Sequence, residues 1–259
     1  REYGIPVTGT MAHSYVLAHH SELDAFVAYA RTYPDDAVLL VDTFDTVRGV
    51  EIAVEAARIV AEEGIEIRGI RLDSGDLAEL ATASRQILDD AGLEDVAIIA
   101  SGGLDEHRVA ELLGRGAPID AFGVGTRVLT SEDDPNIDVV YKLVRDETGP
   151  RLKTSTGKAT LPDVKQVHRF SEGGSPVRDV IALAAEPVPE GASPMLIPMM
   201  ERGRRVGGPE PLAAVRDRAT AAVAALPIHL RSLGPVATPY PVEVSEELMA
   251  LTERLTGAT

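Results

Sequence analysis

A dense group of charged residues follows an apolar run in the segment IRLDSGDL, which places Arg71, Asp73 and Asp76 just before an amphipathic pattern. An arginine can bind an anion, and carboxylates can accept hydrogen bonds from ribose hydroxyls or hold Mg²⁺ on phosphates. Asp76 can instead cap the helix that begins at Leu77. Capping accounts for one aspartate and leaves Arg71 and Asp73 unexplained, so the segment predicts the edge of a binding site.

Two glycine motifs have the composition of phosphate-holding turns. Ser101-Gly102-Gly103 and Gly123-Val124-Gly125-Thr126 each follow an apolar run and precede a helical pattern. They offer backbone N–H groups with no Cβ to keep a phosphate at a distance. Either motif alone is more typical of a tight turn, but two on consecutive units favour a phosphorylated ligand.

Among the six histidines, His13 has a setting in which an imidazole could do chemistry. It lies between Gly9-Thr10 and Ser14 at the end of an apolar run, where it could act as a nucleophile or a general base. Asp42 and Asp45 follow the next apolar run. For these two carboxylates both interpretations stay open: direct contact with a ligand, or support of the residues that make it.

A strand–helix repeat must position these clusters. Apolar, β-branched runs start near residues 38, 67, 96 and 121, and helical patterns follow at 50–63, 77–90 and 105–115. IPVTGT and a helix at 21–31, capped by Ser21, form an earlier unit. A βα barrel is favoured over a doubly wound sheet, because no unit opens with the GxGxxG of a dinucleotide-binding crossover. In a barrel every cluster reaches the C-terminal face, where ligand sites are built.

The α/β chain is predicted to have three parts. Residues 1–145 form the βα barrel with its catalytic face. Residues 146–185 alternate polar and apolar side chains around Gly and Pro, which predicts antiparallel hairpins of a second, β-rich domain. Residues 186–259 form a Pro/Gly-rich wrap, in which 186–211 is expected to be loop, and two C-terminal helices.

The composition narrows the classes of function. The 41 acidic and 25 basic residues give a net charge of −16, which would repel a nucleic-acid backbone or an anionic membrane surface. The absence of cysteine excludes disulfides, thiolate catalysis and Cys-based zinc sites. We therefore expect a cytoplasmic protein with small-molecule partners and with neither nucleic acid nor membrane as a partner.

The blocks GTMAHSYV, LLVDTFDT, GIRLDSGDL, ASGGLDE, PIDAFGVGT and LPIHLRSL, in this order, resemble the nicotinate phosphoribosyltransferase family. The blocks GTxAHS, RLDSGD and FGVGT are the specific ones, and the resemblance spans nearly the whole sequence. Members of that family carry a further region before the point where this sequence starts. The chain therefore resembles the C-terminal part of the usual protein, as a fragment or a processed product.

The resemblance implies an activity and a fold. The family forms nicotinate mononucleotide from nicotinate and phosphoribosyl pyrophosphate, with Mg²⁺ and with ATP as co-substrate. Its fold is an irregular βα barrel of the type II phosphoribosyltransferase kind, joined to a smaller β-rich domain that the N-terminal region shares. It also implies a homodimer with active sites at the subunit interface, where aromatic residues from the N-terminal region stack on the pyridine ring. We therefore expect the chain alone to show little or no activity.

The resemblance also assigns roles to individual residues of this sequence. His13 resembles the histidine that ATP phosphorylates, and Thr10 would lie beside the nicotinate. Arg71 would face the pyridine carboxylate or the pyrophosphate, and Asp73 the ribose hydroxyls. Asp76 is the candidate for Mg²⁺. The other predicted substrate-binding residues are Ser14, Asp42 and the six that would hold the 5′-phosphate, namely Ser101, Gly102, Gly103, Gly123, Gly125 and Thr126.

Alternatives remain open at the level of the sequence. The first alternative is a relative that uses nicotinamide. Its choice of the amide over the carboxylate is expected to depend partly on a residue upstream of Arg1. Another phosphate-binding lyase or aldolase would need a Schiff-base lysine. No lysine stands at the ends of the four predicted strands that start near residues 38, 67, 96 and 121. A catalytically silent interaction protein that keeps the fold is disfavoured by the intact set of His13, Arg71, Asp73 and Gly125.

Overall fold

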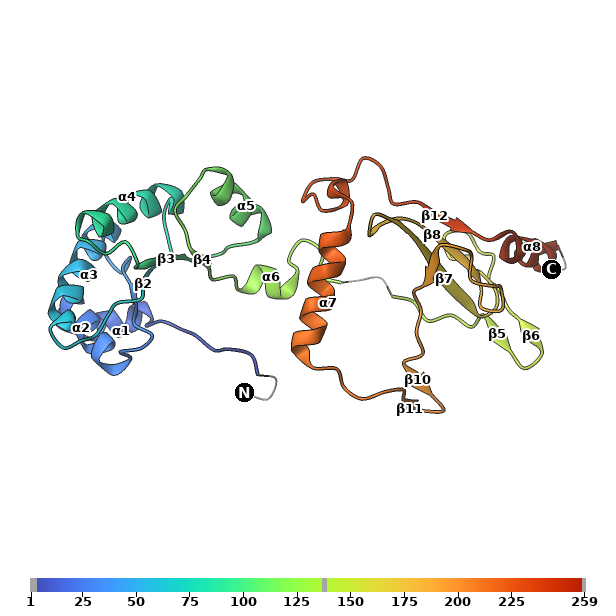
Figure 1. Ribbon diagram of the computed structural model, residues 1–259, viewed down its shortest axis with the longest axis horizontal. Coiled ribbons are helices and arrows are strands. Elements are labelled where there is room, and N and C mark those ends of the chain that lie inside the picture. Colours follow the sequence, from blue (N-terminus) through green and yellow to red (C-terminus); the bar gives the residue numbers. More distant parts are fainter. Residues whose placement is uncertain (1–3, 137–138, 258–259) are drawn as a thin grey trace. The chain divides into compact units, whose positions relative to one another are not determined.

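The computed structural model describes residues 4–136 and 139–257, and contacts divide them into two compact units (Figure 1). The first unit comprises residues 5–136, and the second comprises residues 139–257 together with Gly4. No helix in the described ranges is both long and apolar enough to cross a membrane.

A parallel sheet organises the first unit. Its strands are hydrogen-bonded in the order β1 (Val38–Leu40), β2 (Gly69–Leu72), β3 (Ala97–Ala100) and β4 (Ala121–Phe122). Among the described residues the sheet is open, with β1 and β4 at its edges. The predicted strand starts agree with these strands within two residues, and the predicted α/β class is confirmed.

A helix follows each strand of this sheet. The helices of the unit are α1 (His13–Leu17), α2 (Glu22–Thr32), α3 (Thr46–Ala61), α4 (Leu77–Asp90), α5 (Glu106–Gly114) and α6 (Thr126–Thr130). Ser21 caps α2 as predicted, because its hydroxyl accepts a hydrogen bond from the Asp24 N–H at 3.1 Å. In Figure 1, α2, α3 and α4 lie together on the outer side of the sheet.

The predicted first strand is wrong for this chain. Residues 5–10 belong to no strand of the described sheets, and Ile5 and Val7 are 57% and 85% exposed. A strand needs a neighbour to complete its ladder of backbone hydrogen bonds. The apolar pattern of this segment is therefore present without the partner that would make it a strand.

The two faces of the parallel sheet have different environments. Alternate residues face the helices, and those of the three longer strands are at most 1% exposed: Leu39, Ile70, Leu72, Ile98 and Ala100. They form one core with the inward residues of α2, α3 and α4, and burial of each large side chain stabilises the fold by about 1.5–3 kcal/mol. The residues between them point to the opposite face, which is where Arg71 lies.

Gly49 allows α3 to approach the end of β1. A Cβ at Gly49 would lie 1.9 Å from the Val41 carbonyl oxygen, so any side chain there would collide with the strand. Asp45 begins the helix by accepting a hydrogen bond from the Arg48 N–H at 2.8 Å. This close packing fixes the short loop between β1 and α3, which carries Asp42 and Thr43.

The second unit is rich in antiparallel strands. A four-stranded sheet has the order β12 (Val242–Val244), β8 (Ser175–Leu183), β7 (Lys165–Glu172) and β9 (Ala192–Pro194). The β7–β8 and β7–β9 pairs are antiparallel, and β12 is parallel to β8. The remaining elements are β5 (Arg145–Asp146), β6 (Gly149–Pro150), β10 (Met200–Glu201), β11 (Arg204–Arg205), α7 (Leu212–Ala225), the 3₁₀ helix Ile228–Leu230 and α8 (Glu246–Gly257).

The prediction that 186–211 is loop is wrong in part. The segment contains β9 and the two-residue strands β10 and β11, which form a hairpin. Arg202 and Gly203 have positive φ angles of 49° and 76°, as a tight hairpin turn requires. Strands of two or three residues are too short to produce a visible alternation in the sequence.

Candidate functional site

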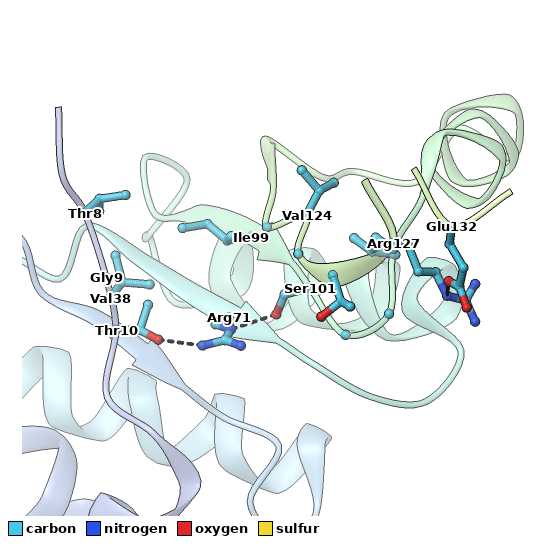
Figure 2. Close-up of a pocket in the computed structure, with 16 residues that line it drawn as sticks. Thr8, Gly9, Thr10, Val38, Arg71, Ile99, Ser101, Val124, Arg127 and Glu132 are labelled. Carbon is cyan, nitrogen blue, oxygen red and sulfur yellow. Dashed lines mark hydrogen bonds and ion pairs between the residues drawn. The ribbon is translucent and has the colours of Figure 1, made fainter. Parts of the chain in front are cut away.

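A cavity lies at the carboxyl ends of the parallel strands (Figure 2). Its volume is about 690 Å³, and its lining includes Thr10, Arg71 and all six predicted phosphate-binding residues. The register explains the convergence: Arg71 pairs with Ile99, so the next residues along β2 and β3 bring Asp73 and Ser101 side by side. Residues more than 90 positions apart in the sequence thus lie together at the carboxyl ends of the strands.

Arg71 lies at the centre of a hydrogen-bond network. Its Nε donates to Ser101 Oγ at 2.7 Å, its Nη1 to Thr10 Oγ1 at 2.9 Å and its Nη2 to Asp73 Oδ1 at 2.5 Å. Figure 2 shows the guanidinium between Thr10 and Ser101. A guanidinium carries five N–H donors, so two remain for a ligand.

His13 faces the carboxylates of Asp42 and Asp73, and these three residues lie beside the cavity and not in its lining. Its Nε2 lies 3.9 Å from Asp42 Oδ1 and 3.8 Å from Asp73 Oδ2, and its Nδ1 lies 3.2 Å from Thr43 Oγ1. The His13 side chain is 41% exposed, whereas that of Asp42 is 1% exposed. The imidazole is therefore accessible to a reactant from solvent, and two carboxylates lie near its Nε2.

Asp42 is anchored through one oxygen. Its Oδ2 accepts from the Asp73 N–H at 3.1 Å and from Ser74 Oγ at 2.6 Å. Its Oδ1 is buried without a hydrogen-bond partner in the described residues, and such an atom is costly unless something pairs with it. The His13 Nε2 lies 3.9 Å from this oxygen, so Asp42 faces the histidine with Oδ1 and supports the Asp73 loop with Oδ2.

The charge of Asp73 is stabilised by its neighbours. Burial alone would raise the pKa of its carboxyl, but hydrogen bonds from Ser101 and Arg71, together with the charges of Arg71 and His13, outweigh burial and lower that pKa below its ordinary value. Asp73 is therefore ionised at neutral pH. An ionised carboxylate at this position can accept from hydroxyls or stabilise positive charge on a ligand.

The two glycine loops provide free backbone donors. The N–H of Ser101 donates to the Leu72 carbonyl at 2.8 Å and that of Gly123 to the Ala100 carbonyl at 2.7 Å, so these two extend the sheet. Among the N–H groups of these loops without an acceptor in the part of the chain that the structure describes are those of Gly102, Gly103, Gly125 and Thr126. Four free donors on two adjacent loops form a suitable cradle for a phosphate group.

Gly102 and Gly123 are required by close approach. Gly102 has a φ of +91°, and a Cβ there would lie 1.9 Å from the Asp73 carbonyl oxygen. A Cβ on Gly123 would lie 3.1 Å from Ser101 Cβ. The absence of a side chain at Gly102 therefore lets the loop after β3 lie against the Asp73 loop, and Gly123 lets the loop after β4 lie close to Ser101.

Asp76 and Ser14, like His13, Asp42 and Asp73, are not in the cavity lining, but within the described ranges Asp76 and Ser14 also make no hydrogen bond or ion pair with the side chain of Arg71 or His13. Asp76 caps α4, accepting from the N–H groups of Ala78 and Glu79 at 3.1 and 3.2 Å, which confirms the prediction of a cap. Its carboxylate also pairs with Arg115. Ser14 is exposed on α1.

Potential metal ligands gather at another point of the first unit. Among the described residues, Glu106, His107 and Asp133 bring ligand atoms within 4.8 Å of one another, and all three are exposed. None of them lines the cavity beside Arg71. This trio is separate from Asp76, the predicted Mg²⁺ residue.

Three residues of the candidate site, Thr43, Arg127 and Glu132, do not follow from the sequence patterns described above. Thr43 contacts the His13 imidazole, and Arg127 and Glu132 line the cavity. Arg127 pairs with Asp105 at 2.8 Å and with Glu132 at 3.2 Å. A basic residue directly after the GVGT motif was a usable signal for Arg127, whereas the contact between His13 and Thr43 has no local signature.

Comparison with known proteins identifies similar chains. A nicotinate phosphoribosyltransferase of Mycobacterium tuberculosis is 47% identical over 259 residues, which is 100% of this chain and 55% of that protein. The nicotinate phosphoribosyltransferase of Bacillus subtilis is 43% identical over 202 residues, which is 73% of this chain and 40% of that protein. The chain thus spans about half the length of the curated relatives it matches. No family model matches it.

A solved structure shares the fold. The crystal structure of human nicotinic acid phosphoribosyltransferase superposes with a TM-score of 0.83 and 27% sequence identity, covering 99% of this chain and 63% of that chain. The fold predicted from the resemblance is therefore confirmed.

The lowered pKa of Asp73 predicts a pH-dependent contribution to stability. An unfolded aspartate titrates near about 3.9, so ionised Asp73 stabilises the folded state above that pH, and this contribution is lost as the pH falls through the lower folded-state pKa. Asp73→Asn should therefore lower the free energy of unfolding at pH 7 by about 1–3 kcal/mol, and by much less at pH 2–3. Urea unfolding of both proteins across this range measures the difference.

Asp35→Asn is the matched control, because Asp35 is exposed before β1. It should change stability by less than about 0.5 kcal/mol at every pH. A difference between wild type and Asp73→Asn that stays constant from pH 7 to pH 2 would contradict the assigned role of the Asp73 charge.

Proposed function

We propose, because the chain belongs to the nicotinate phosphoribosyltransferase family, that the protein containing it joins nicotinate to phosphoribosyl pyrophosphate and releases nicotinate mononucleotide and pyrophosphate. The observation that carries this proposal is the Arg71 network beside two loops with free N–H donors. It combines groups suited to a phosphate and an anionic leaving group in the lining of one cavity, and the Asp73 carboxylate, suited to a ribose, is bonded to two of the lining residues, Arg71 and Ser101.

The chemistry fits the charges of the site. The pyridine nitrogen forms a bond to the ribose C1 while the bond from C1 to the pyrophosphate oxygen breaks, and the electron pair leaves with pyrophosphate. Positive character develops on the ribose and negative charge on the leaving group. Ionised Asp73 would accept from the ribose hydroxyls and stabilise the first, and the two free N–H groups of Arg71 would stabilise the second or hold the carboxylate of nicotinate.

The 5′-phosphate would lie on the glycine loops. The free N–H groups of Gly102, Gly103, Gly125 and Thr126 would donate to its oxygens. This arrangement leaves Ser101 and Gly123 to hold the backbone in place, since their N–H groups are already used in the sheet. Electrostatic attraction from Arg71 and Arg127 would offset the acidic character of the whole chain.

Mg²⁺ does not fit the residue for which it was predicted. Asp76 accepts two backbone hydrogen bonds and pairs with Arg115, so its oxygens are engaged and lie outside the cavity lining. A requirement for Mg²⁺ stays a prediction of the family resemblance. The proposed steps therefore use only side chains and backbone groups of this chain.

ATP would act through His13. In the proposed step the imidazole forms a bond to the γ-phosphorus, the bond to the β,γ-bridging oxygen breaks and ADP leaves. The exposure of His13 and its position between Thr43 and two carboxylates support this role. Hydrolysis of the phosphohistidine would then be coupled to a more favourable equilibrium for nucleotide formation.

The site is incomplete in aromatic groups. None of the described residues that line the cavity is aromatic, although a pyridine ring is well suited to stacking. We therefore propose that the remainder of the protein and the second subunit of a homodimer supply the stacking groups, and that the enzyme works in the cytoplasm.

Arg71→Ala should cripple the reaction. Loss of the guanidinium removes the positive charge that stabilises the leaving group, and it also removes a hydrogen bond that orients Asp73. The kcat/KM for nicotinate mononucleotide formation by the whole protein should therefore fall at least about 100-fold. Chromatographic quantification of the nucleotide measures it, with nicotinate and nicotinamide compared as substrates.

Arg68→Ala is the control for this experiment, since Arg68 pairs with Glu66 on the surface; its kcat/KM should stay within about twofold of wild type. Efficient use of nicotinamide in place of nicotinate would reject the proposed substrate. Normal turnover by Arg71→Ala would reject the proposed site.

His13 should carry an acid-labile phosphate after incubation with γ-labelled ATP, because it is the exposed nucleophile at this mouth. His13→Asn should abolish the label and uncouple turnover from ATP. His20→Asn, which changes an exposed histidine of the same segment, should keep both. Labelling that survives His13→Asn would refute the assignment.

A further inference from the structure

We propose that Ser101 is a positioning residue, which orients Arg71 and Asp73 toward the substrate, and that its hydroxyl is not a ligand of the phosphate. The inference rests on the proposed function and concerns a residue that the sequence groups with the phosphate-binding glycines. Its hydroxyl has a different role from the backbone N–H groups of those glycines.

The hydrogen-bonding capacity of the Ser101 hydroxyl is directed at its two neighbours. Its oxygen accepts from Arg71 Nε at 2.7 Å, and its hydrogen is donated to Asp73 Oδ1 at 2.5 Å. A hydroxyl has one hydrogen, and Asp73 is a much closer acceptor than the Leu72 carbonyl at 3.3 Å. Because Ser101 is only 5% exposed, its hydrogen is not available to a phosphate in the cavity.

The two Asp73 oxygens have different contacts in this geometry. Oδ1 accepts from both Ser101 Oγ and Arg71 Nη2, which fixes the plane of the carboxylate. Oδ2 then faces the His13 side of the site, 3.8 Å from His13 Nε2. Ser101 thus helps to orient the carboxylate so that its other oxygen stays available to the ligand.

The same hydroxyl orients the guanidinium. A bond at Nε fixes the rotation of the planar group about its own side chain, while Thr10 and Asp73 hold one hydrogen on each terminal nitrogen. The two remaining N–H donors are then held in one orientation without further ordering. Without Ser101, Arg71 would keep its charge but lose one of the three contacts that orient it.

The backbone holds Ser101 in this place. Its N–H donates to the Leu72 carbonyl at 2.8 Å, which continues the β2–β3 ladder beyond the strands. Gly102 lies against the Asp73 carbonyl and Gly123 against Ser101 Cβ, at positions where a Cβ would collide or crowd. Three independent backbone features therefore bring one hydroxyl to the Arg71–Asp73 pair.

Ser101→Ala in the whole protein tests the inference by separating kcat from KM. We expect kcat to fall about 10- to 100-fold, because misplaced groups lose transition-state stabilisation, while KM for phosphoribosyl pyrophosphate changes less than about threefold. The acid limb of the pH–rate profile should move to higher pH, since the lost hydrogen bond raises the pKa of Asp73. A hydroxyl that binds phosphate would instead raise KM and leave kcat and the acid limb unchanged, which would overturn the inference.

Two further variants protect the test against misfolding. Ser101→Cys keeps the size of the side chain but is a weak hydrogen-bonding group, so it should reproduce the kinetic effect of Ser101→Ala with normal thermal unfolding. Ser84→Ala, which changes a serine that is 2% exposed on α4, should match wild type in kinetics and pH profile. A Ser101→Cys protein with wild-type kcat and acid limb would also overturn the inference.

A second readout separates this inference from the proposed function. Titration of the Asp73 carboxyl carbon by NMR, in whole protein labelled at aspartate, should show a higher pKa in Ser101→Ala than in wild type. If wild type makes no nicotinate mononucleotide, the proposed function fails but this titration still decides whether Ser101 acts on Asp73. An unchanged titration with normal nucleotide formation would reject the role of Ser101 and keep the function.

Discussion

The fork of hydrogen bonds from Arg71 joins the loops that make up the site. Thr10 precedes the sheet in the sequence, Asp73 follows β2 and Ser101 follows β3, and one guanidinium contacts all three. A buried or partly buried cation needs such partners, because an unpaired charge is costly to remove from water. The same contacts lower the pKa of Asp73. The Arg71 guanidinium therefore both holds the three loops together and keeps Asp73 ionised for the proposed chemistry.

The glycine loops complement this cationic centre. Gly102 lets the first loop lie against Asp73 and Gly123 lets the second lie close to Ser101, and the loops leave the N–H groups of Gly102, Gly103, Gly125 and Thr126 free. Charge neutralisation by a guanidinium and directional donation by backbone amides are the two ways in which a protein of net charge −16 can hold an anion locally. The parallel sheet brings them together, since both lie at the carboxyl ends of its strands.

Much of this arrangement follows from the sequence. Short apolar runs predict β1 to β4, since buried parallel strands need no alternation, and helical periodicity predicts α2 to α5, because each of these helices is long enough to show its period. The strand predicted at Ile5–Val7 fails, since a strand also needs a partner that the periodicity of one segment cannot reveal. The same limit applies to the site. Position after a strand predicts Arg71 and Asp73, but the contact of His13 with Thr43 and the use of the Ser101 hydroxyl depend on packing between separate units of the repeat.

The central claim is that a phosphate-bearing ligand rests on the free amides of the two glycine loops beside Arg71. The most direct test is hydrogen–deuterium exchange, resolved to single amides, in the whole protein with and without nicotinate mononucleotide. The account predicts slower exchange at Gly102, Gly103, Gly125 and Thr126 on binding. Ser101 and Gly123, whose N–H groups are already bonded within the sheet, should change little. Binding of the nucleotide with unchanged exchange at all four free amides would contradict the account.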